Sequence, residues 1–357
     1  MGAGRGRTLK RGSGVNTRKS VSPRRSPERS RCQSAWSGKR RCSRRRTSGV
    51  CRYLRPVHTR RINWKPTINN TRSDARALPG NFGVEYLDAD VTTLSDEALR
   101  QLLLDLYANR ILVLRTAGLT EAEYVHFARR IGEPLLLIPN KVEHPEIIPV
   151  DNLREDIRET KLSAAHWHSD QSFTSPLASV TMLHSLAAPA AGGETHFCDM
   201  VAAYDALSER TRSEIDELEV VHRRGVSIVA RPEEHAPPVL KQRDYRTVYH
   251  PLVRSHPITG RKTLYAVSGS SQGVRGMSDT DAKRLLESLC AHALSLRFLT
   301  AHKHRVGDVL LWDNPTTMHK ASPIGQATGP ADTRVIWRIS LTGTPSVFPE
   351  CRDAGDA

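Results

Sequence analysis

Residues 307–319 have the sequence GDVLLWDNPTTMH, and this stretch constrains the architecture more than any other. Its apolar run VLLW has the length of a buried strand, and the polar turn DNPTT then leads to His319. A second stretch, AAHWHSDQSF at residues 164–173, supplies His168 and Asp170. Alternate residues of a strand lie on one face, so we expect these two side chains to point to one place. We expect His319 to meet them there.

The chain after residue 76 is typical of a mainly β fold. Four helices are predicted from their N-caps and apolar spacing, and the first of them covers residues 96–109. The strand-like apolar stretches are residues 111–114, 179–186, 263–267, 309–312 and 335–341. The helix caps are Ser95, Thr120 (in a capping box with Glu123), Asp199 and Ser278. Many strands without βαβ alternation indicate a β-sandwich or open barrel with helices packed outside.

Charge divides the chain into two parts. Residues 1–76 hold 23 of the 53 Lys and Arg but only two acids, Glu28 and Asp74. Their net charge is therefore +21. The whole chain has a net charge of +15, so the remaining residues have a net charge of −6. A mildly acidic body argues against a nucleic-acid surface on the folded part. We expect one folded domain at residues 77–350.

The basic tail, residues 1–76, is rich in Arg, Ser and Gly, and we expect it to be disordered because it cannot bury a core. Three interpretations stay open. Dense Arg could bind polyanions, and an Arg- and Ser-rich segment could be a targeting signal. The tail could also be an extension of the reading frame beyond the true start. We prefer the last, because nothing in the tail connects to the chemistry of the body.

The six cysteines and the absence of long apolar runs indicate a cytoplasmic protein without a membrane span. No CxxC pair occurs, so a zinc ribbon or a disulfide framework is not indicated. Free thiols are typical of a reducing compartment. No apolar run reaches the roughly 18 residues that a membrane-spanning helix needs.

The residues His168, Asp170 and His319 form a candidate metal site. Two imidazoles and one carboxylate on one face of a metal leave positions open, which is typical of non-haem Fe(II) that must hold a co-substrate and O2. An isolated H-x-D is a weak signal, and its simplest alternative is a surface histidine beside a solvated acid. His166 with His168, or His302 with His304, would instead suit zinc or copper. Neither pair has a carboxylate at matching spacing. His184 and His196 are interpreted as structural histidines.

Near the C-terminus, the stretch DTRVIWRISLTG at residues 332–343 predicts a strand that carries two arginines on one face. Arg334 and Arg338 would lie roughly 13 Å apart at about 3.3 Å per residue. Guanidinium groups suit bidentate binding of carboxylate or sulfonate, so two anionic groups could be held. The alternative is two solvent-facing arginines on an exposed strand.

Five segments together resemble the taurine dioxygenase / 2,4-dichlorophenoxyacetate dioxygenase (TauD/TfdA) family. They are WHSDQSF, GGETHF, HPLVRSHPITGRKTLY, GDVLLWDN followed by His319, and R-x-x-x-R, in the family's order over residues 80–345. The resemblance implies a double-stranded β-helix, the cupin-like jelly roll. It also implies iron ligands at His168, Asp170 and His319.

The same resemblance assigns the organic ligands. Thr195 and Arg334 match the residues that bind the distal carboxylate of 2-oxoglutarate. Arg338 matches a substrate-binding arginine, and Trp167 and Phe173 match aromatic positions beside the metal motif. The implied reaction uses Fe(II), 2-oxoglutarate and O2 to hydroxylate a substrate, with release of succinate and CO2. Asp170 argues against a halogenase.

The substrate that we expect is a small anion other than taurine. Ala164 stands where the taurine enzyme has an asparagine, residues 325–332 are an insertion, and residues 268–277 also differ from that enzyme. An aryloxyalkanoate, an alkyl sulfate or sulfonate, or a carboxylated metabolite fits better. The family suggests a homo-oligomer, a dimer or tetramer. The alternative function is polyanion or nucleic-acid binding through the basic tail, with a non-catalytic jelly-roll body.

Overall fold

The computed structural model describes residues 75–136, 143–153, 164–224, 227–229 and 246–354. The predicted tail lies outside these residues except for its last two, Ala75 and Arg76. These two belong to β1 (Ala75–Ala77), which pairs with β2 (Val84–Tyr86). The described part of the chain therefore begins two residues before the predicted start at residue 77.

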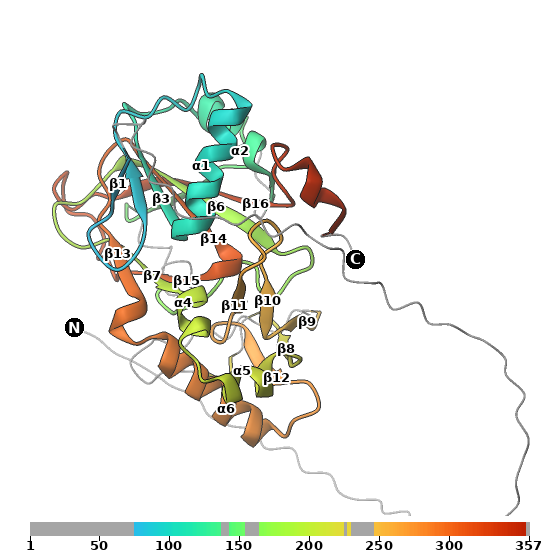
Figure 1. Cartoon of the computed structure of the whole chain (residues 1–357). Coiled ribbons are helices and arrows are strands. Elements are labelled where there is room, and N and C mark those ends of the chain that lie inside the picture. Colours follow the sequence, from blue (N-terminus) through green and yellow to red (C-terminus); the bar gives the residue numbers. More distant parts are fainter. Residues whose placement is uncertain (1–74, 137–142, 154–163, 225–226, 230–245, 355–357) are drawn as a thin grey trace, which may run out of the picture. The chain divides into compact units, whose positions relative to one another are not determined.

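A large sheet forms the centre of the domain (Figure 1). Its strand order is β1-β2-β3-β14-β6-β16-β4, and β5 also pairs with β16. Only the β2–β3 pair is parallel among the pairings of this sheet. The remaining bounds are β3 (Ile111–Arg115), β4 (Glu133–Pro134), β5 (Ile148–Asp151), β6 (Ala178–Ala187), β14 (Asp308–Asp313) and β16 (Val335–Thr342).

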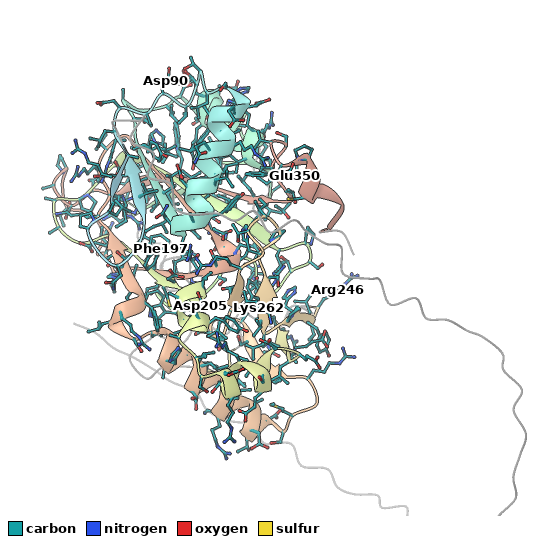
Figure 2. All side chains as sticks on the ribbon, in the orientation of Figure 1. Asp90, Phe197, Asp205, Arg246, Lys262 and Glu350 are labelled. Carbon is teal, nitrogen blue, oxygen red and sulfur yellow. The ribbon has the colours of Figure 1, made fainter. Side chains whose placement is uncertain are left out.

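A smaller sheet of order β13-β7-β15 faces the large one. Its strands are β7 (Thr195–Asp199), β13 (Leu299–His302) and β15 (Thr317–Ala321), all paired antiparallel. Phe197 of β7 (Figure 2) packs with Leu310, Trp312 and Ile336 of the large sheet, so a buried layer separates the two sheets. Two facing sheets with helices outside confirm the predicted mainly β jelly-roll class.

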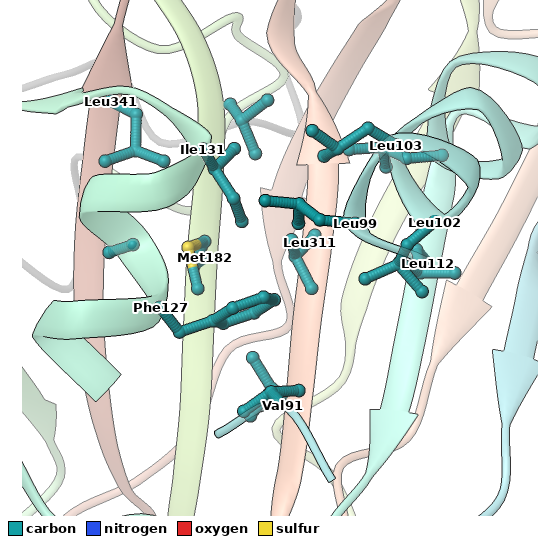
Figure 3. Packing of buried hydrophobic residues seen from close by; sticks show 14 of the residues in the cluster. Val91, Leu99, Leu102, Leu103, Leu112, Phe127, Ile131, Met182, Leu311 and Leu341 are labelled. Atoms are coloured by element: carbon teal, nitrogen blue, oxygen red, sulfur yellow. The ribbon is translucent and has the colours of Figure 1, made fainter. Parts of the chain in front are cut away.

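Two helices cover the outer face of the large sheet. Ser95 caps α1 (Asp96–Asn109), and Thr120 with Glu123 forms the predicted capping box of α2 (Glu121–Ile131). Both helices therefore begin where their caps predicted. Their apolar faces meet the sheet in one core (Figure 3). The contacting residues include Leu99, Leu103, Phe127 and Ile131 of the helices and Met182, Leu311 and Leu341 of the sheet.

The remaining helices and strands enclose a second core below the sheets in Figure 1. Asp199 and Ser278 cap helices as predicted, but α5 after Ser208 was not anticipated. Ile215 is its one buried residue, so the helix has no apolar periodicity to recognise. The bounds are α4 (Met200–Asp205), α5 (Glu209–Ile215), α6 (Asp279–Ala293), β8 (Glu219–His222), β9 (Val248–Pro251), β10 (Val253–Ser255), β11 (Lys262–Leu264) and β12 (Ser271–Val274), with short 3-10 helices η1 (Leu296–Phe298), η2 (Asn314–Thr316) and η3 (Pro349–Ala354).

No helix among the described residues is both long and apolar enough to cross a membrane.

A buried histidine, His222 at the end of β8, gives the fold a predictable response to acid. Its Nδ1 lies 2.9 Å from Ser270 Oγ, and Ser270 Oγ lies 2.6 Å from Ser172 Oγ. Burial lowers the pKa of His222 to about 3, with the nearby charges of His250 and Arg254 acting in the same direction. The folded-state pKa thus lies below the value of roughly 6.5 in the unfolded chain.

Acidification should therefore destabilise the domain through His222. The unfolded chain takes up the proton first, so this contribution to stability is present above pH 6.5 and is lost as the pH falls toward 3. Between pH 7 and 4.5 the loss at this one site should be about 2 to 3 kcal/mol. Urea unfolding at the two pH values measures it. His222→Gln should flatten the dependence, and a slope equal to that of the unchanged protein would contradict the assignment.

Candidate active site

His168, Asp170 and His319 converge as predicted. Their ligand atoms all lie within 4.8 Å of one another, and no other such group of His, Cys, Asp or Glu occurs in the described parts of the chain. The Nε2 atom of His168 lies 3.6 Å from Asp170 Oδ1, and that of His319 lies 3.7 Å from Asp170 Oδ2. The three side chains thus surround one point from three directions, as metal ligands must.

The backbone that achieves this differs from the prediction. We expected His168 and Asp170 on one strand, but His168 makes only an isolated β-bridge, with His319 on β15, and Asp170 lies in a turn. The bridge has two hydrogen bonds, from His168 N to His319 O at 3.0 Å and from His319 N to His168 O at 2.8 Å. The strand prediction was wrong because the polar residues after His168 turn the chain instead of extending it. Gln171, with φ of 52°, continues that turn.

Neighbouring polar groups hold the carboxylate of Asp170 in place. Thr181 Oγ1 donates to Asp170 Oδ2 at 2.8 Å, and Asn314 Nδ2 donates to Thr181 Oγ1 at 2.9 Å. Asn314 Oδ1 accepts from Trp312 Nε1 at 3.0 Å and from the backbone of Asp170 at 3.3 Å. The turn after the VLLW strand therefore orients a ligand on a different segment, a role that its sequence did not reveal. Such outer contacts fix ligand geometry in metal sites.

The ionised carboxylate of Asp170 and the neutral ring of His319 suit the binding of a cation. His168 Nδ1 donates to His166 O at 2.7 Å, and its Nε2 is turned toward Asp170. Burial holds the pKa of His319 well below its usual value, so this imidazole is neutral. Burial alone would raise the pKa of Asp170, but the charge of Arg338 opposes it, and that pKa lies well below its usual range. The site thus offers two imidazoles and one ionised carboxylate, and these residues fit a non-haem iron.

Arg338 lies against this carboxylate. Its Nη2 is 2.7 Å from Asp170 Oδ1 and 3.1 Å from Ser340 Oγ. The guanidinium is therefore within reach of whatever binds at the metal position. Trp167 and Phe173, the two aromatic residues predicted beside the metal motif, lie in different surroundings. Trp167 is buried in the second core with Lys320 Nζ 5.2 Å from its ring, whereas Phe173 is half-buried beneath Arg224.

Arg334, unlike Arg338, has no carboxylate partner among the described residues. Its side chain is 7% exposed, its Nε has no hydrogen-bond partner, and burial lowers its pKa to about 10. The GGET turn lies against it, because a Cβ built on Gly193 would come within 3.3 Å of Arg334 Cδ. A buried cation without a counter-charge is costly, so this position fits an incoming anion.

Thr195 follows the same turn and is also buried. Its Oγ1 lies 3.0 Å from His304 Nε2, and the charge of Arg334 acts on His304. The structure therefore gathers Thr195 and Arg334, which are distant in the sequence, around one buried polar region.

The insertion at residues 325–332 is fastened by Asn152, a residue that sequence patterns did not single out. Asn152 Nδ2 donates to Gly325 O and to Asp332 O, both at 2.9 Å, and Asn152 Oδ1 accepts from Arg334 N at 2.8 Å. The buried amide thus ties both ends of the insertion to the backbone of Arg334. The longer loop is compatible with a fixed position of this arginine.

The rival pair His302 and His304 is engaged in other contacts. His302 Nε2 donates to Asp308 Oδ2 at 3.0 Å, and His304 lies between two hydroxyl groups. His184 accepts from Leu119 N, and His196 Nε2 lies 2.8 Å from Ser322 Oγ, so both are structural as predicted. None of these four belongs to the cluster at His168.

Comparisons with known proteins identify the family of the chain. The family model "Taurine catabolism dioxygenase TauD, TfdA family" matches residues 74–340. An alpha-ketoglutarate-dependent 2,4-dichlorophenoxyacetate dioxygenase of Cupriavidus pinatubonensis is 30% identical over 260 residues, which cover 67% of this chain and 87% of the relative. An alpha-ketoglutarate-dependent sulfate ester dioxygenase of Pseudomonas putida is 28% identical, with coverage of 76% and 89%.

A solved structure shows the same fold. The crystal structure of AAD-2 in complex with Mn(II) and N-oxalylglycine superposes with a TM-score of 0.65 at 27% identity, covering 76% of this chain and 97% of that one. The chain therefore belongs to the TauD/TfdA family and is a 2-oxoglutarate-dependent dioxygenase.

Proposed function

We propose that this enzyme uses Fe(II), 2-oxoglutarate and O2 to hydroxylate a small anionic organic substrate, with release of succinate and CO2. The observation that carries the proposal is the convergence of two imidazoles and one ionised carboxylate on a single point. The buried guanidinium of Arg334, which has no carboxylate partner among the described residues, supports it, because the second carboxylate of 2-oxoglutarate needs such a partner.

Each residue then has a defined task. His168, Asp170 and His319 hold the metal, and Thr181 and Asn314 orient the carboxylate among them. Thr195 and Arg334 bind the distal carboxylate of 2-oxoglutarate and so orient its 2-oxo acid end toward the metal. Bound iron supplies the activation of O2 that oxidises the substrate.

Arg338 is the residue that we assign to the substrate's anionic group, with Trp167 and Phe173 as its aromatic surroundings. In the structure this guanidinium pairs with Asp170. With a cation held by Asp170, Arg338 would share this carboxylate with it and would be available to an external anion. The relatives named for a phenoxyacetate and for sulfate esters act on anionic compounds, which supports a carboxylate, sulfate or sulfonate substrate here.

The substrate assignment can be tested by measuring succinate release over a panel of aryloxy acids, alkyl sulfates, sulfonates and carboxylated amines. Arg338→Ala should lower kcat/KM for the substrate found by about 100-fold, because one charge-assisted contact is worth about 1.5 to 3 kcal/mol. It should leave the affinity for 2-oxoglutarate within about threefold. Faster turnover of uncharged analogues than of every anion, in both proteins, would reject an anionic substrate.

The remaining expectations stay predictions. Polyanion binding by the tail concerns residues that lie, except for Ala75 and Arg76, outside the described part of the chain. A cytoplasmic location and a dimeric or tetrameric state are likewise proposals. Sedimentation of the purified enzyme would measure the oligomeric state directly.

A further inference from the structure

The imidazole of His304 lies between two hydroxyl groups beside the proposed 2-oxoglutarate site. Its Nδ1 is 3.0 Å from Ser185 Oγ on β6, and its Nε2 is 3.0 Å from Thr195 Oγ1 on β7. The residue is 4% exposed and therefore connects the large sheet to the small one within the interior. No part of the proposed reaction has yet used it.

The loop that carries His304 is fixed on both sides. Asp308 Oδ2 accepts from His302 Nε2 at 3.0 Å and from Arg305 N at 2.8 Å, and Asp308 also pairs with Arg115. The rings of His302 and His304 are 5.0 Å apart and nearly perpendicular. Because its neighbours on both sides are anchored, His304 keeps one position against Thr195.

The protonation of His304 restricts how this chain of hydrogen bonds can run. Burial lowers its pKa well below the usual value, and the charges of His302, Arg334 and Arg115 act in the same direction. The ring is therefore neutral and carries one N–H. In the first possible arrangement, His304 Nε2–H donates to Thr195 Oγ1, and the Ser185 hydroxyl donates to His304 Nδ1. In the second, the Thr195 hydroxyl donates to His304 Nε2, so the Thr195 proton is already engaged in that hydrogen bond.

An anion beside Arg334 selects between these two arrangements. In the first, the hydroxyl proton of Thr195 is available to an external acceptor, and in the second it is not. A carboxylate next to Arg334 gains a second donor only in the first arrangement. Its binding therefore favours the tautomer of His304 with the proton on Nε2.

We propose that His304 is a positioning residue for the co-substrate: by donating from Nε2 to Thr195 Oγ1, it directs the Thr195 hydroxyl proton to the distal carboxylate of 2-oxoglutarate. This inference rests on the proposed function of Thr195 and Arg334. It gives the enzyme selectivity for a 2-oxo dicarboxylate over 2-oxo monocarboxylates, because the relay from Ser185 through His304 acts only on the second carboxylate.

Calorimetric titration of the Mn(II)-loaded enzyme with 2-oxoglutarate and with 2-oxobutyrate tests the relay. 2-Oxobutyrate has the same metal-binding end but no distal carboxylate. His304→Phe should raise the Kd of 2-oxoglutarate about tenfold and leave that of 2-oxobutyrate within about twofold. His304→Gln keeps a donor and an acceptor on one side chain, so it should retain the affinity for 2-oxoglutarate within about threefold.

A double-mutant cycle shows whether His304 acts through Thr195. Thr195→Val should cost about tenfold in the otherwise unchanged enzyme but at most about twofold when His304 is already Phe. Nitrogen NMR of the Zn(II)-loaded enzyme should show the proton on Nε2 of His304 once 2-oxoglutarate is bound.

The outcomes separate this inference from the proposed function. Enzyme that binds neither acid would overturn both. Enzyme that binds 2-oxoglutarate equally well with His or Phe at position 304 would overturn the relay alone. Equal losses for both acids would show a merely structural role, and a proton on Nδ1 in the complex would contradict the stated direction of donation.

Discussion

His319→Ala should lower the affinity for Fe(II) by at least about 100-fold, because even contacts outside the ligand set are worth 10- to 100-fold in metal sites. His319 supplies one of three ligand atoms and is 6% exposed, so no solvent-side group can replace it. The anaerobic complex with Fe(II) and 2-oxoglutarate should then lose its weak visible charge-transfer band, and His168→Ala should do the same. Titration with Fe(II) under nitrogen, followed by spectroscopy, measures both quantities.

His196→Ala is the matched control for this prediction. His196 lies on β7, opposite Lys320 of β15, and its ring contacts Ser322 instead of the metal ligands. The band and the affinity for Fe(II) should survive this change. A His319→Ala enzyme that keeps the band would place the metal elsewhere and would reject the proposed centre.

Arg334→Met should weaken the binding of 2-oxoglutarate without lowering the stability of the metal-free fold. The change removes the guanidinium that we assign to 2-oxoglutarate, so affinity for this acid should fall by at least about 100-fold, the effect of losing one or two charge-assisted hydrogen bonds. The metal-free fold should keep or gain stability, because Arg334 is a buried cation without a carboxylate partner and Met has similar length. Calorimetry with 2-oxoglutarate and urea unfolding provide the two measurements.

Arg338→Met is the natural comparison, since it alters the arginine on β16, whereas Arg334 lies just before that strand and not within it as predicted. Arg338 is paired with Asp170, so its loss should destabilise the metal-free fold while 2-oxoglutarate affinity stays within about threefold. The two variants are thus expected to change stability in opposite directions. Unchanged 2-oxoglutarate affinity in Arg334→Met would assign the distal carboxylate to another group.

The sequence predicted the helices through their caps, because capping is a local interaction. Ser95, Thr120, Asp199 and Ser278 each accept from backbone N–H groups within four residues, and each begins a helix. In the large sheet, β3, β6, β14 and β16 were predicted from their apolar residues, whereas the short strands β1, β2, β4 and β5 were not predicted. The α5 helix was missed because its stability depends on neighbours instead of its own apolar pattern.

The amino-acid sequence by itself determined which residues could form a metal site, since only certain side chains bind iron and only one H-x-D precedes a distant histidine in a matching context. The tertiary structure alone decided how they meet. The His168–His319 bridge, the Asn314 contact to Thr181, the Asn152 clamp on Arg334 and the His304 relay all join segments far apart in the chain. Such contacts form only when the two sheets pack, so no local pattern encodes them.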